Sequence, residues 1–243
     1  MMRDALAPLL DLADVSDAID SARRAADAAF AHRALRRPTG TGARIAAEVT
    51  LRGAVASAAL SGSEHDLADV RSGTVTDPVL QGSLRVAAEL VTLAPRWFKA
   101  PPQVMTRLHI LAARGVVADL GRPAPSGGTA RLLALSSVLN SSAPALLRAA
   151  VVHGELLALR AFEGPNGVVA RAAGRLTLIA AGLDSRGLLP VDVGHFGREP
   201  EYLGAAGAFA TGTPDGLRSW IRHYGAAVEE AAAELSRVCD QVG

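Results

Sequence analysis

The residues best suited to chemistry lie in a tight turn between two apolar segments, residues 151–159 and 167–183. The turn reads Ala-Phe-Glu-Gly-Pro-Asn-Gly, and glycine, proline and asparagine supply the backbone conformations that it needs. Asn166 and Gly167 open the second segment, so the free N–H groups of a helix N-terminus face the turn and attract anions. Arg171 adds a permanent charge one helical turn later. The spacing predicts an anion site, and it fits a plain helix-turn-helix of the core equally well.

The window from 160 to 171 resembles the motif of the Fic (Fido) family, H-P-F-x-[D/E]-G-N-G-R-x-x-R. Four residues stand at their family positions: Phe162, Asn166, Gly167 and Arg171. The family also carries A-x-x-H in the preceding helix, and Ala150 and His153 reproduce that pattern. The agreement is therefore strongest in the phosphate-cradling half of the motif.

The departures from the motif fall on its reactive positions. Four residues differ: Arg160 replaces the catalytic histidine, Gly164 the magnesium-binding acid, Pro165 the first glycine and Val168 the first arginine. Glu163 provides a carboxylate one position early. About half of the motif is thus altered.

Two other stretches resemble the family, and together with the motif they span about residues 45–235. Residues 57–62 resemble its inhibitory helix, S-x-x-x-E-[G/N], with Ser57 and Gly62 in place and Ser61 at the glutamate position. Leu189 and Pro190, followed by Tyr202, Trp220 and Tyr224, resemble its C-terminal helices. The order of the three stretches is more specific than the motif alone.

The resemblance implies a mechanism whose central parts are missing here. In active Fic enzymes the motif histidine deprotonates a target hydroxyl, which attacks the α-phosphorus of ATP, and the last arginine grips the γ-phosphate. Arg160 stays protonated and cannot act as a base, a loss worth about 10²–10⁴ in rate. Gly164 offers magnesium no oxygen ligand. The sequence therefore predicts a degenerate site without AMP transfer, with no catalytic residue and no metal ligand to assign.

The anion-binding part of the site is better kept. We expect Arg160, Asn166, Gly167 and Arg171 to form a nucleotide- or phosphate-binding pocket, for which a mono- or diphosphate compound suits better than ATP, because magnesium is lacking. No other cofactor is expected. The inhibitory-helix-like residues are Ser57, Ser61 and Gly62, and we expect that Ser61 cannot pair with Arg171 as the family glutamate does.

Two alternatives stay open. In the first, Arg171 pairs with a local carboxylate such as Glu155 or Glu163, the pocket is empty, and the chain is a scaffold that binds a protein partner. In the second, the chain is a transferase with altered chemistry, in which Arg160 stabilises a phosphate and His153 or His195 acts as base.

The composition limits the classes of partner that we expect. Of 243 residues 49% are hydrophobic and the formal net charge is +1, which indicates neither nucleic acid nor an acidic membrane surface as a partner. A single cysteine, Cys239, suits a reducing compartment. No uncharged run of about 18 apolar residues occurs, so we expect a cytoplasmic protein that does not span a membrane. The oligomeric state is left open.

Helical periodicity runs through nearly the whole chain and predicts an all-α fold. The resemblance implies that this fold is a Fic-like helical bundle. We divide it into an N-terminal helical extension, residues 1–40, and a Fic-like domain, residues 41–243. Ser16 is the expected N-cap of a first helix, and Pro95 is expected to break the helix that Asp77 caps. The resemblance implies a small β-hairpin flap before the motif helix, and residues 119–130 are the candidate for it, with a plain loop as the alternative.

Overall fold

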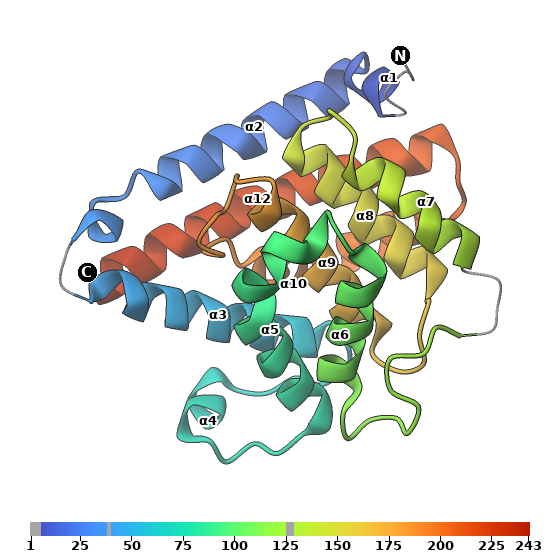
Figure 1. Ribbon diagram of the computed structural model, residues 1–243. Helices are drawn as coiled ribbons and strands as arrows, with labels where there is room; N and C mark the ends of the chain where they lie inside the picture. Colours follow the sequence, from blue (N-terminus) through green and yellow to red (C-terminus); the bar gives the residue numbers. More distant parts are fainter. Residues whose placement is uncertain (1–5, 38–39, 125–128) are drawn as a thin grey trace.

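The computed structural model describes residues 6–37, 40–124 and 129–243, and its elements are helices joined by loops (Figure 1). In chain order they are α1 (Ala7–Leu10), α2 (Ala13–Phe30), the 3₁₀ helix η1 (Arg33–Arg36), α3 (Thr41–Ala59), α4 (Leu67–Ser72), α5 (Pro78–Trp97), α6 (Pro101–Ala113), α7 (Thr129–Leu139), α8 (Ala145–Leu159), α9 (Asn166–Ala180), α10 (Val191–Gly197), α11 (Glu199–Ala210) and α12 (Pro214–Val242). The all-α fold class is confirmed.

Helix α9 forms the centre of the bundle. Every residue from 168 to 179 is buried, so this helix contacts neighbours on all sides. One face, with α8, adjoins a core shared with α5, α6 and α7, and the other side lies against a second core built by α2, α3 and α10–α12. The near-continuous apolar sequence of α9 requires such a position.

The N-terminal helix α2 lies along the last helix α12, as Figure 1 shows in blue and red. Val15, Ile19, Ala22, Ala26 and Ala29 recur at helical spacing and enter the same core as α12. The boundary placed at residue 40 stays a prediction.

Two expected helix ends were wrong. Helix α2 begins at Ala13, before Ser16, and its N-cap residue Leu12 makes no side-chain capping bond. Helix α5 begins as expected, with Asp77 Oδ1 accepting from two backbone N–H groups at 2.9 Å. It then continues through Pro95 to Trp97, whose indole Nε1 donates to Thr177 Oγ1 at 2.9 Å. Burial of Trp97 against α9 stabilises the last turn of α5 and outweighs the lost backbone bond.

The stretch proposed as a flap contains no strand within residues 119–124. It makes a single antiparallel bridge, between Pro123 and Phe162, and Ala124 N donates to Ala161 O at 2.7 Å. Residues 125–128 lie outside the described residues. The segment thus lies against the turn of the motif, and the hairpin stays a prediction.

In the described residues, no helix combines the length and the apolar character that crossing a membrane requires.

Candidate functional site

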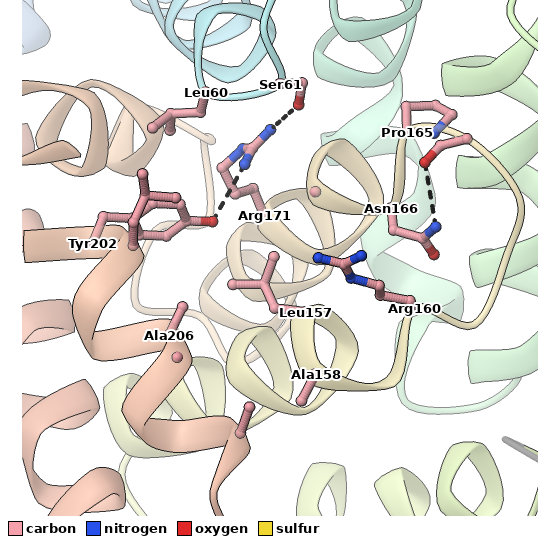
Figure 2. Close-up of a pocket in the computed structure, with 15 residues that line it drawn as sticks. Leu60, Ser61, Leu157, Ala158, Arg160, Pro165, Asn166, Arg171, Tyr202 and Ala206 are labelled. Carbon is pink, nitrogen blue, oxygen red and sulfur yellow. Dashed lines mark hydrogen bonds between the residues drawn. The ribbon is translucent and has the colours of Figure 1, made fainter. Parts of the chain in front are cut away.

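A pocket of about 570 Å³ opens beside the turn of the motif (Figure 2). We call it the motif pocket. Its walls are the ends of α3 and α8, the turn that follows Arg160, the first turns of α9 and one face of α11. All four candidates for anion binding, Arg160, Asn166, Gly167 and Arg171, line it, together with Ser61. Ser57 and Gly62 are absent from the lining, although Ser57 contacts Arg171 from behind.

The side chain of Asn166 holds the turn closed. Its Oδ1 accepts from Phe162 N at 2.9 Å, and its Nδ2 donates to the carbonyls of Phe162 and Gly164. These bonds occupy both donors of the amide. Asn166 therefore shapes the pocket, and its side chain is not available to a ligand.

His109, which the sequence did not mark as part of the site, braces the same turn from α6. Its Nδ1 accepts from Gly121 N at 2.9 Å, so the proton lies on Nε2, which donates to Glu163 O at 2.8 Å. Its ring stacks on Phe162 with 4.6 Å between centroids. A lone helical histidine gives no signal of this role in the sequence.

Arg160 carries a charge in the pocket that has no partner among the described residues. It ends α8 in the left-handed conformation, with φ 44° and ψ 55°, and among the described residues no other non-glycine residue has a positive φ. This conformation is usual for glycine and costs other residues about 1–2 kcal/mol. The side chain is exposed and has no hydrogen-bond or ion-pair partner in the described part of the chain. Figure 2 shows its guanidinium directed into the pocket.

The N-terminus of α9 supplies free donors next to Arg160. Val169 N bonds to the Pro165 carbonyl at 3.3 Å, whereas the amides of Gly167 and Val168 have no partner in the described residues. Such N–H groups favour an anion. Gly167 also allows Arg171 to lie close, because a Cβ at 167 would sit 3.0 Å from Arg171 Nη1.

Arg171 is buried, with 3% of its surface exposed, and its donors point mostly into the protein. Nε donates to Ser57 Oγ at 2.9 Å, Nη1 to Tyr202 OH at 3.2 Å, and Nη2 to Ser57 O and Ser61 Oγ, both at 2.7 Å. Four of its five N–H groups are therefore used. Ser61 Oγ thus accepts a hydrogen bond from Arg171 but, as a neutral hydroxyl, cannot form the ion pair that the family glutamate forms.

Arg171 pairs with a carboxylate, as the first alternative expected, but the partner is Asp192 and not Glu155 or Glu163. Arg171 Nε lies 3.6 Å from Asp192 Oδ1, and Arg175 Nη1 lies 3.5 Å from Oδ2. All three side chains are buried. The negative charge thus sits behind the motif pocket, and the pocket lining itself contains no carboxylate.

The two histidines considered as alternative bases do not line the motif pocket. Burial lowers the pKa of both His153 and His195 well below the ordinary value, and nearby positive charge from Arg171 acts in the same direction. His153 Nε2 lies 3.2 Å from Tyr202 OH, and His195 Nδ1 lies 3.0 Å from His223 Nε2. Neither ring reaches a ligand in the pocket directly.

These histidines make stability depend on pH. Burial lowers the pKa of His153, His195 and His223 in the folded chain. As the pH falls below 6.5, the unfolded chain therefore takes up protons on these side chains before the folded chain does. The contribution of these neutral histidines to the free energy of unfolding is fully present above pH 6.5. Below pH 6.5 it decreases by at most about 1.4 kcal/mol per group and pH unit. Burial raises the pKa of Asp184 to about 6, which acts in the opposite direction below that pH. We expect urea denaturation to give a lower free energy of unfolding at pH 5.5 than at 7.5. A flat profile would contradict the burial of neutral histidines.

Comparison with known proteins gives the fold a name. No protein-family model matches the sequence, and no curated protein matches it. Among solved structures, a Fic family protein from Desulfovibrio desulfuricans G20 superposes with a TM-score of 0.73 at 19% identity, covering 92% of this chain and 74% of that one. Residues 134–508 of Fic-1 from C. elegans give 0.75 at 17% identity, covering 98% and 76%. The chain therefore has the helical fold of Fic proteins.

Proposed function

We propose that this chain binds a mono- or diphosphate compound in the motif pocket and does not transfer AMP. The observation that carries the proposal is the unpaired guanidinium of Arg160 together with the free amide of Gly167, both in a lining without carboxylates, and the free amide of Val168 follows directly in the first turn of α9. Guanidinium and backbone N–H groups are good partners for a phosphate oxygen. Arg171 contributes charge and one remaining N–H, while Asn166 contributes the shape of the turn.

Arg160, rather than Arg171, is therefore the main contact that we propose for the ligand. Arg171 already satisfies Asp192, so its charge is partly neutralised before a ligand arrives. Gly164 and the exposed Glu163 offer no metal ligand inside the pocket, since Gly164 lacks a side chain and Glu163 is not in the lining. A triphosphate would therefore keep uncompensated charge, which favours one or two phosphates.

Calorimetry with inorganic phosphate, AMP, ADP and ATP tests the proposal. We expect Arg160→Met to weaken the best ligand by about 10- to 150-fold, because a charge-assisted hydrogen bond is worth about 1.5–3 kcal/mol. Arg222→Met is the matched control, since Arg222 is exposed on α12 and outside the pocket lining.

Two outcomes would oppose the proposal. Equal binding by wild type and Arg160→Met would place the ligand elsewhere. If no phosphate compound binds, the protein-interaction scaffold becomes the better explanation. A protein partner and a cytoplasmic location stay predictions.

A further inference from the structure

One face of α11 in the motif pocket is apolar and uncovered. Leu203, Ala206, Gly207 and Ala210 follow one another at the spacing of a single helix face, and all four line the pocket. Leu203 is 57% exposed, the most of the three large hydrophobic residues that are exposed among the described residues. The opposite face of α11 is buried through Tyr202, Ala205 and Phe209. This face is therefore open to the pocket, although Ala206 also packs against the core.

The same pocket continues this wall onto α8 and α3. Leu157, Ala158 and Leu60 add further apolar surface, while Arg160 points into the same pocket (Figure 2) and Gly167, with its free amide, also lines it. The pocket is thus amphiphilic: a cationic, hydrogen-bonding part adjoins an apolar wall.

The wall offers little to a sugar or a nucleobase. The other polar side chains of the lining, Ser61, Asn166, Arg171 and Tyr202, already bond within the protein. Tyr202, the single aromatic residue in the lining, is 2% exposed and presents no ring face for stacking. Ribose hydroxyls and base nitrogens placed on α11 would lose hydrogen bonds to water without replacing them.

We propose that the ligand of the motif pocket is an anionic amphiphile, a phosphate monoester of an apolar alcohol. This inference rests on the proposed phosphate site and adds the chemistry of the rest of the ligand. The phosphate contacts Arg160 and the amides of Gly167 and Val168, and the hydrocarbon lies along α11 against Leu203 and Ala206. Contact of the hydrocarbon with this face removes apolar surface of both from water.

Calorimetry with inorganic phosphate, butyl phosphate, octyl phosphate and AMP, each below micelle-forming concentration, tests the inference. Each fully buried methylene increases affinity about fourfold. Because the pocket is open, we expect octyl phosphate to bind at least about 10-fold more tightly than butyl phosphate, and more tightly than AMP.

Variants separate the two parts of the site. Leu203→Ser, at an exposed position, should weaken octyl phosphate by about 10-fold and leave inorganic phosphate unchanged, whereas Arg160→Met should weaken both. Val91→Ser is the matched control, because Val91 is also exposed, at 49%, on α5 and outside the motif pocket.

The failures are distinguishable. Inorganic phosphate binding without any gain from chain length, or AMP binding more tightly than octyl phosphate, overturns the amphiphile and leaves the phosphate site standing. If Arg160→Met does not change the binding of octyl phosphate, the amphiphile proposal is overturned, because the compound then adsorbs to apolar surface. The same holds if Val91→Ser weakens the binding as much as Leu203→Ser does. Absence of binding by every compound overturns both proposals.

Discussion

Replacing Arg171 by methionine is expected to lower the free energy of unfolding by about 3–5 kcal/mol, the cost of removing one partner from a buried ion pair. Asp192 would keep only Arg175, at 3.5 Å, and both serine hydroxyls from the end of α3 would lose their donor. Methionine fills much of the volume of the arginine stem, so the loss reports charge and hydrogen bonds rather than a cavity.

Urea denaturation followed by circular dichroism measures this effect. Arg222→Met makes the same chemical change at an exposed position of α12 and should shift stability by no more than about 0.5 kcal/mol. A loss at Arg171 no larger than that of this control would show that its contacts with α3, α10 and α11 do not hold the fold together.

No transfer of AMP is expected from the wild-type chain incubated with labelled ATP, magnesium and candidate target proteins, and restoring the motif histidine with Arg160→His should not produce it. The missing base costs about 10²–10⁴ in rate, and restoring it leaves magnesium without an acidic ligand. The double variant with Arg160→His and Gly164→Asp should also transfer no AMP. Gly164 has φ +80°, and a Cβ there would lie 2.8 Å from Val117 Cγ1, so an acidic side chain does not fit this turn.

An active Fic enzyme with an intact motif, run in parallel, shows that the assay works. Labelling by the wild-type chain, abolished by a change in the motif pocket, would mean that another group supplies the base. Labelling by Arg160→His alone would mean that magnesium finds a ligand which the geometry of the pocket does not provide.

Much of the fold follows from local sequence signals. Asp77 as the cap of α5 and the apolar sequence of α9 predicted these helices correctly, because caps and periodicity act within a few residues. The prediction at Pro95 was wrong because a contact between distant segments outweighs a local effect. The local effect of Pro95 is to break a helix, and contacts of Trp97 with α9 override it. Ser16 was a capable cap in a place where the core set an earlier start.

The candidate site was predictable in its position and not in its bonding. The motif order placed Arg160, Asn166, Gly167 and Arg171 around one pocket. That Arg171 points to Asp192 and not to Glu155 or Glu163 depends on how α10 packs against α9, which no local pattern specifies. The apolar wall on α11 was missed because alanine and glycine carry no functional signal, and only the fold reveals that this face is uncovered.

The left-handed backbone of Arg160 sets stability against ligand binding at one position. Glycine would relieve the strain there, and it would also remove the single unpaired guanidinium that the described residues place in the pocket. A change to glycine at position 160 would therefore favour the folded backbone and, under the proposed function, weaken the hold on a phosphate.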